Sequence, residues 1–137
     1  MLKKIAVIVI ACALVFTVYT KNNQPIFKGY ANSFEFYLSS PSSNAKIVRV
    51  DDNLLFIGKD VYGESFRANE KNFCLEEFLS DFNAEVVAVE SIAEGISYYA
   101  YSPKIKYRAK VNDKIVNLHV FIGESVTVGA PLIYGSF

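Results

Sequence analysis

The sequence contains no tryptophan, one histidine, one methionine and only two cysteines among its 137 residues. Two cysteines cannot form a disulfide framework, and a single histidine leaves no clustered ligand set for a metal ion. Four prolines and seven glycines are too few for a low-complexity chain. Fourteen basic residues balance fourteen acidic ones, so the chain lacks the positive charge typical of a nucleic-acid binder. We therefore expect no metal, no cofactor and no nucleic-acid partner.

The one long apolar run covers residues 5–19 and follows Lys3 and Lys4. As a helix it is roughly 22 Å long, whereas a hydrocarbon core of about 30 Å needs nearer 20 residues. Residues 2–20 could still cross if the lysine ends snorkel, with the remainder outside the cytoplasm. We predict a signal anchor or signal peptide over 1–20, hence a single-pass protein of the cell membrane, or a secreted protein if cleaved. A lipoprotein modified at Cys12 and a buried core helix stay open as alternatives.

The rest of the chain is predicted to be a polar tether over 21–33 and a single domain over 34–137. The fold class is α+β, with one helix packed on an antiparallel β-sheet. Helical spacing of apolar residues predicts that helix over 73–82, with Asn72 as its N-cap and Cys74 buried. Turns are expected at 39–44, 51–53 and 112–113. Alternating or short apolar runs predict strands at 34–38, 47–50, 54–57, 61–67, 85–90, 96–102, 104–111, 114–123, 125–128 and 131–134.

Four cationic residues alternate with apolar ones along the predicted strand 104–111, so they share one strand face. A two-residue turn at 112–113 would place Lys106 opposite His119 and Arg108 opposite Asn117. We therefore predict an exposed anion-binding patch for an anionic envelope polymer, a lipid headgroup or an acidic protein. The alternative is a solvated face whose lysines discourage edge pairing. The candidate patch consists of Lys104, Lys106, Arg108, Lys110, Asn117 and His119.

No catalytic residue is assigned. His119 lacks an orienting carboxylate, and the expected neighbour Lys106 would lower its pKa. A second hypothesis is a small cell-envelope glycan hydrolase that uses two of Glu85, Glu90 and Glu94. In that hypothesis the active site is a groove lined by tyrosines, namely Tyr98, Tyr99 and Tyr101. The favoured interpretation is a membrane-anchored extracytoplasmic module that binds or interacts and is not an enzyme.

Three stretches of the C-terminal half, 95–103, 116–120 and 128–133, are similar to segments of a known family. They resemble that family's strand ending in Tyr-Ser/Thr-Pro, its Asn-Leu-x-Val strand and its terminal Gly-x-Pro motif followed by two apolar residues. The family is the YwmB-like group of exported proteins of Gram-positive bacteria, which have a TATA-box-binding-like fold. The resemblance covers roughly residues 84–137 and implies an exported α+β domain without assigning catalytic residues. The family's members are about twice as long, with two related halves, and the ending Tyr134-Gly135-Ser136-Phe137 departs from their pattern.

Overall fold

The computed structural model describes residues 1–22, 25–38, 45–51 and 61–134 of the chain. The first half contains the long helix α1 (Leu2–Asn22), strands β1 (Ser33–Leu38), β2 (Lys46–Asp51) and β3 (Val61–Ala68), a 3₁₀ turn (Glu70–Asn72) and helix α2 (Leu75–Asp81). The second half contains β4 (Glu85–Ile92), β5 (Gly95–Tyr101), β6 (Ala109–Val111), β7 (Lys114–Val116), β8 (Leu118–Ile122) and β9 (Val126–Ala130).

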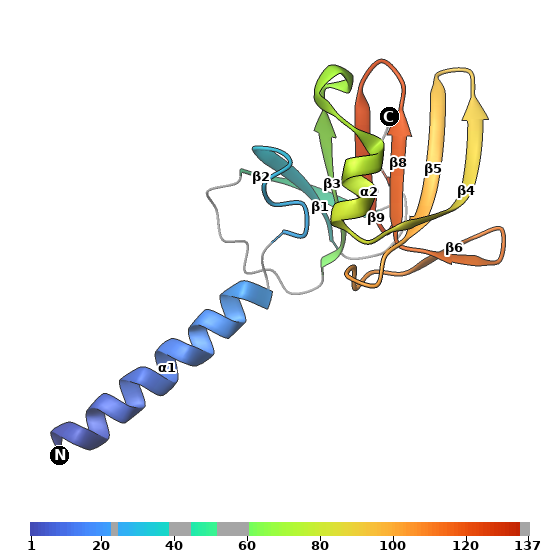
Figure 1. The fold of residues 1–137 in the computed structure, drawn as a ribbon. Helices are drawn as coiled ribbons and strands as arrows, with labels where there is room; N and C mark the ends of the chain where they lie inside the picture. Colours follow the sequence, from blue (N-terminus) through green and yellow to red (C-terminus); the bar gives the residue numbers. More distant parts are fainter. Residues whose placement is uncertain (23–24, 39–44, 52–60, 135–137) are drawn as a thin grey trace.

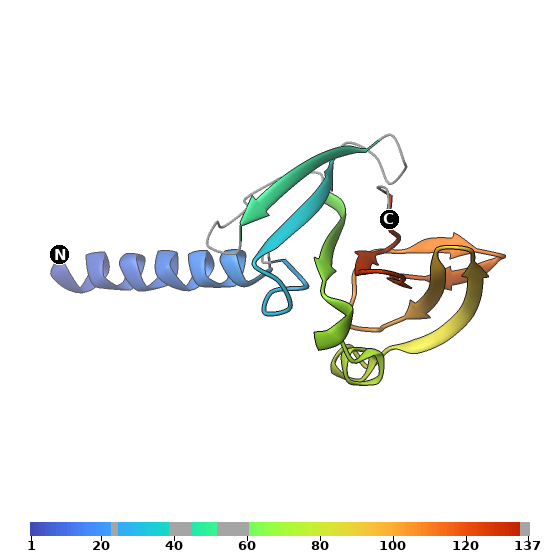
Figure 2. The ribbon, with the colours of Figure 1, turned by 90° about the horizontal axis from the view of Figure 1, so that it is seen from above.

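Seven strands form one antiparallel sheet in the order β2-β1-β3-β9-β8-β5-β4, and β6 and β7 form a separate hairpin. Helix α2 covers one face of this sheet, and the sheet curves strongly around it (Figures 1 and 2). The predicted α+β class with an antiparallel sheet is confirmed. Asn112 and Asp113 have φ angles of 49° and 63°, which suit the two-residue hairpin turn expected between β6 and β7.

The core lies between the sheet and α2. Alternation in β1 places Phe34 and Phe36 inside, as predicted, against Phe78 and Phe82 of the helix region. In the C-terminal half, alternation predicts six inward residues. Five of them are buried, namely Ile105, Tyr107, Val116, Leu118 and Val120, and Ile122 is partly buried against the core. Period-two and helical spacing therefore identified these core residues, because alternate strand positions share one face and residues at helical spacing share another.

The opposite face of the sheet is also covered at its centre, which the sequence did not predict. The segment that follows β9 turns back across the sheet on the side away from α2 (Figure 2). Its path is so close that a Cβ atom on Gly129 would lie 2.7 Å from the carbonyl oxygen of Leu132. Tyr134 then packs edge-on against the fully buried Tyr37, with ring centroids 5.1 Å apart. Polar residues on this face are consequently buried.

The predicted tether is wrong for the stretch around Phe27. This ring is fully buried and packs against Phe66 and Phe82, at centroid distances of 5.0 and 5.7 Å. Tyr30 also joins the aromatic cluster and donates a hydrogen bond to Asp81 (2.6 Å). Burial is the main cause that raises the pKa of Tyr30 to about 12, and the bond to Asp81 and its charge add to it. The polar composition of 21–33 concealed Phe27, which completes the core, and Tyr30, which packs on the edge of the aromatic cluster while staying exposed.

Helix α1 projects away from the domain in both views (Figures 1 and 2). Its apolar side chains are exposed on all sides, with exposed fractions such as 62% for Ile8 and 70% for Val15. Within the part of the chain that the structure describes, no helix combines the length and the apolar character needed to cross a membrane.

Several predicted boundaries are corrected. Helix α2 begins after Cys74, which is its N-cap. The predicted N-cap Asn72 belongs to a separate 3₁₀ turn, which Asn69 caps by accepting the amide of Lys71. Cys74 is exposed, not buried. Of the predicted strand 104–111 only 109–111 is a strand, the strand 114–123 is broken at Asn117, and 131–134 is not a strand. The predicted strand 54–57, the turn 39–44 and most of the turn 51–53 lie outside the described residues.

Candidate functional site: a basic loop

The cationic residues predicted to lie on one strand instead occupy a loop and the hairpin that follows it. We use the term basic loop for residues 103–114, whose five exposed cations are Lys104, Lys106, Arg108, Lys110 and Lys114. The segment before β6 is not a strand because Pro103 lacks an amide hydrogen and Asn117 occupies the neighbouring backbone groups. Ile105 and Tyr107 still point into the core, so the alternating in-and-out pattern is retained in a loop.

Asn117 holds the start of the basic loop in place. Its side-chain oxygen accepts the amide of Ser102 (2.7 Å), and its amide nitrogen donates to the carbonyl oxygens of Ser102 (2.7 Å) and Ile105 (3.0 Å). The hydroxyl of Ser102 donates to the carbonyl of Phe82, which ties the loop to the end of α2. A buried amide with this many partners is stabilising, and it fixes the backbone from which the lysines extend.

Arg108 is itself anchored within the loop. Its guanidinium donates to the carbonyl oxygens of Ile105 and Tyr107 and to the hydroxyl of Tyr101 (3.3 Å). It also lies 5.1 Å from the centroid of the Tyr101 ring, which is a cation–π distance. Arg108 therefore contributes positive charge to the surface, while most of its donors serve the loop.

The lysines retain more free donors. The ammonium of Lys104 donates to the carbonyl of Asp81 (2.8 Å), and that of Lys114 reaches the carbonyl of Val87 (3.4 Å). Lys106 lies 5.3 Å from the centroid of the Tyr107 ring. Each ammonium has three donors, so one contact leaves capacity for an anion. Lys106 and Lys110 are the exposed lysines of this loop with the weakest ties to the backbone.

The prediction that Asn117 and His119 belong to the exposed patch is wrong. Asn117 is fully buried and His119 is 3% exposed. His119 pairs with Tyr99 and Gly129, not with Lys106, because β8 lies between β5 and β9 in the large sheet. The predicted pairing holds only within the short hairpin, where Lys110 lies opposite Ile115. The break at Asn117 separates the hairpin from the sheet.

His119 and Ser97 form a buried pair that resembles part of a nucleophilic dyad but is arranged differently. The Nε2 atom of His119 lies 3.1 Å from Oγ of Ser97, while Nδ1 accepts the amide of Ile133 (3.3 Å). Because Nδ1 accepts, the proton is on Nε2, and the imidazole donates to the serine instead of withdrawing its proton. Burial lowers the pKa of His119 to about 4, which keeps the ring neutral. The Tyr99 ring stacks on it at 4.5 Å.

Glu64 connects the basic loop to the segment that follows α1. This carboxylate is 2% exposed and accepts the amides of Ile26 (2.6 Å) and Phe27 (3.3 Å). Its other oxygen accepts the hydroxyl of Tyr107 (3.3 Å). Burial raises the pKa of Glu64 to about 7, although these hydrogen bonds and the charge of Lys106 oppose the increase. Burial raises the pKa of the Tyr107 hydroxyl, and the neighbouring Glu64 raises it further.

The residues of the hydrolase hypothesis are not brought together as that hypothesis requires. Glu85 and Glu90 are exposed on β4, five positions apart, which is roughly 16 Å along a strand. A glycosidase pair needs about 5–9.5 Å. Glu94 lies at the turn after β4 and lines an open hollow with Glu124. Tyr98 faces the α2 side, whereas Tyr99 stacks on His119 and Tyr101 contacts Arg108, so the tyrosines do not line a common groove.

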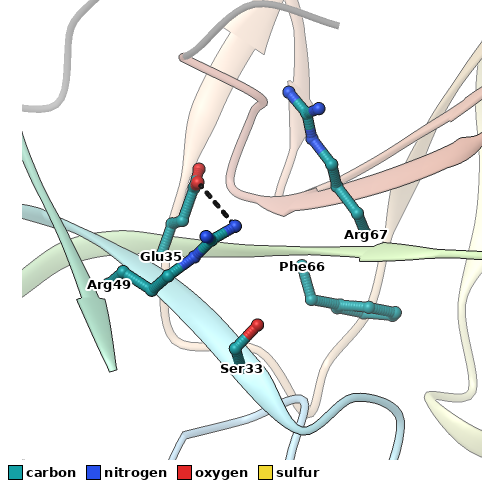
Figure 3. A pocket seen from close by; sticks show the side chains of 5 residues that line it. All are labelled: Ser33, Glu35, Arg49, Phe66 and Arg67. Atoms are coloured by element: carbon teal, nitrogen blue, oxygen red, sulfur yellow. Dashed lines mark ion pairs between the residues drawn. The ribbon is translucent and has the colours of Figure 1, made fainter. Parts of the chain in front are cut away.

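A small hollow lies at the other end of the sheet, between β1, β2 and β3 (Figure 3). Glu35 and Arg49 form an ion pair there at 3.9 Å, and Arg67 extends from β3 apart from that pair (Figure 3). The space is about 40 Å³, which accommodates a few water molecules at most. Exposed ion pairs contribute little to stability, and we assign no ligand to this hollow.

Sequence reasoning missed Lys114 and Glu64. Lys114 follows the predicted turn directly and lies opposite Val111. The predicted hairpin therefore already placed Lys114 beside the other cations of the basic loop. Glu64 and Phe66 are two positions apart in β3 and so share one face of the strand, which indicated that the carboxylate points inward. Its partners come from segments 37 to 43 residues away, and no local pattern identifies them.

No family model, curated protein or solved structure matches this chain. The interpretation of the basic loop therefore depends on its own geometry.

Proposed function

We propose that the chain is a membrane-anchored binding module of the bacterial cell envelope, with α1 in the bilayer and the folded domain outside the cytoplasm. Because α1 falls short of a full apolar span, this proposal requires the lysines at its ends to snorkel to the bilayer surface. The observation that carries this proposal is the exposure of α1. A helix that is apolar on all sides needs an apolar environment, which is either a protein core or a membrane. Helix α1 has no such protein cover among the described residues, and it starts with Lys3 and Lys4, which favour the cytoplasmic side.

A binding role is favoured over catalysis by the arrangement of the polar groups. The basic loop presents five cations on a backbone held by Asn117, which suits the attraction of anions. The Ser97–His119 pair has its proton on the wrong nitrogen for nucleophilic catalysis. The resemblance to the YwmB-like exported proteins supports the same location, since its three segments fall in and around the adjacent strands β5, β8 and β9. Membership of that family is part of the proposal.

The two native cysteines provide a direct test of the topology. Cys12 lies in α1 and Cys74 is exposed on the domain. In intact bacterial cells, a membrane-impermeant maleimide should label the Cys12→Ser variant through Cys74 and should fail to label the Cys74→Ser variant. The full chain should also stay with the membrane during alkaline carbonate extraction. Protection of Cys74 until lysis, or release of the chain by carbonate, would overturn the proposal.

A further inference from the structure

We infer that Glu64 acts as a proton-controlled latch between two segments that lie outside the seven-stranded sheet. The neutral carboxyl group keeps both segments closed against the core, and its ionised form releases them. One segment follows α1 and covers residues 25–31, here called the post-helix segment, and the other is the basic loop. This inference goes beyond the proposed function and does not depend on it, because the latch requires neither a membrane nor a bound anion.

The side chain of Glu64 connects both segments to β3. One carboxyl oxygen accepts the amides of Ile26 (2.6 Å) and Phe27 (3.3 Å) in the post-helix segment. The other oxygen accepts the hydroxyl of Tyr107 (3.3 Å) in the basic loop. Phe27 is fully buried and Tyr107 is 8% exposed, so both rings belong to the core. A single buried group therefore bonds two parts of the chain that are far apart in sequence.

The two segments can open without the sheet. Among the described residues, the backbone hydrogen bonds of the post-helix segment join only residues of that segment. In the basic loop the side chain of Asn117 bonds the backbone as far as Ile105, and Tyr107 lies two positions beyond. Segments that are held mainly by side chains open at a lower free energy than the strands of a sheet.

The surroundings of Glu64 favour the neutral carboxyl group. Glu64 is 2% exposed, and its direct neighbours on the adjacent strands are Phe36 of β1 and Ala130 of β9, which are both apolar. The titratable and charged groups that face it are the Tyr107 hydroxyl and Lys106, both from the basic loop. In the described part of the chain, no cationic group forms an ion pair with it. A buried carboxylate without such a partner is costly, so ionisation favours a state in which water reaches it.

The closed state therefore depends on pH. In the neutral group, the carbonyl oxygen still accepts both amides and the protonated oxygen stays next to Tyr107. Burial raises the pKa of Glu64 from 4.5 to about 7 in the closed state, although its hydrogen bonds and the charge of Lys106 oppose the increase. The closed state is thus most favoured below about pH 4.5 and loses this advantage as the pH rises to about 7. The opening constant should rise roughly tenfold per pH unit between these values, by about 300-fold in all.

Native-state hydrogen exchange of the full chain in detergent tests the latch. Peptides are followed by mass spectrometry at about pH 4.5 and about pH 8, and each rate is corrected for the intrinsic pH dependence of amide exchange. We expect the protection of the post-helix segment and of residues 103–108 to fall on the order of 100-fold over this range. Strands β8 and β9 should remain the last to exchange at both pH values, because local opening leaves the sheet folded.

Three variants identify the group that titrates. Glu64→Gln keeps an oxygen for the two amides but cannot ionise, so protection should stay high and independent of pH. The matched control His119→Gln removes another buried titratable side chain and should keep the parental fall in protection. Tyr107→Phe removes a hydroxyl that stabilises the ionised carboxyl group, so the fall should move to higher pH. A merely structural role of Tyr107 would leave this midpoint unchanged.

Each other outcome overturns the inference. Protection that does not change with pH in the parent would exclude the latch. The parental fall in Glu64→Gln would assign the titration to another group. Loss of protection in all strands together with the two segments would show global unfolding instead of local opening. If Glu64→Gln does not fold, Tyr107→Phe decides, and an unchanged midpoint in that variant overturns the inference. None of these results bears on whether α1 lies in a membrane.

Discussion

Asn117 shows how one buried amide sets the shape of a surface loop. It bonds three backbone groups of Ser102 and Ile105. The two carbonyl oxygens also accept from the Ile105 amide and the Arg108 guanidinium, so the buried amide of Ser102 depends most on Asn117. Asn117→Ala should therefore lower the free energy of unfolding by about 1–3 kcal/mol, the cost of leaving buried polar groups unpaired. Urea unfolding of the full chain in detergent measures this. The control Lys110→Ala, on the exposed hairpin, should stay within about 0.5 kcal/mol of the parent. Equal stability of the two variants would contradict the role of Asn117.

Glu64 and His119 should give the stability of the protein two opposing pH dependences. Burial raises the pKa of Glu64 from 4.5 to about 7 and lowers that of His119 from 6.5 to about 4. The folded chain holds the Glu64 proton more tightly than the unfolded chain, so stability falls as pH rises from about 4.5 to 7. For His119 the unfolded chain takes up the proton first, so stability falls as pH drops from about 6.5 to 4.

Two variants separate these contributions. Glu64→Gln should leave a stability profile that declines on acidification below about pH 6.5 and is flat above it. His119→Gln should leave the opposite profile, which declines as pH rises from about 4.5 to 7. Thermal unfolding across this pH range measures both. The Tyr107 hydroxyl donates to Glu64, and burial raises its pKa, so it stays protonated across this range. Profiles that keep the parental shape in both variants would refute this account.

At the scale of the elements, β4 is an edge strand of the sheet, and among the described contacts the ammonium of Lys114 reaches it at the carbonyl of Val87. It pairs with β5 on one side only, and it exposes Val86 and Val89, with exposed fractions of 44% and 57%. Edge strands of this kind pair with other chains unless a charge blocks them. Val89→Lys should reduce aggregation of the full chain in detergent, as measured by light scattering, while the free energy of unfolding changes by less than about 0.5 kcal/mol. Val89→Ile, which keeps the edge apolar, should aggregate like the parent. Equal aggregation of all three would exclude β4 as the cause.

For the whole molecule, the segment between the anchor and the sheet belongs to the fold. Phe27 is in the core, and its backbone amide is bonded to Glu64. A chain that starts at residue 25 should therefore fold cooperatively, whereas one that starts at residue 34 should lose fixed tertiary packing. Phe27→Ala in the full chain should cost about 3–5 kcal/mol. Near-ultraviolet circular dichroism and urea unfolding measure these outcomes. A folded chain from residue 34 onwards would restore the tether interpretation.

The sequence by itself determined the α+β class, the positions of most strands, the inward residues of β1 and β8, and the Asn112–Asp113 turn. These follow from local rules, since spacing of apolar residues and turn chemistry act within a few positions. The apolar run at the N-terminus was equally evident, and its role in the membrane stays a prediction.

Only the tertiary structure decided which polar residues reach the surface. The alternation around Asn117 and His119 is that of a strand with one exposed face, yet residues 131–134 cover that face, and Asn117 turns toward the loop backbone. Likewise, the residues that contact Phe27 and Glu64 are 37 or more positions away in the sequence. Burial depends on what the rest of the chain places over a residue, and a pattern of neighbours in sequence contains no information about that cover.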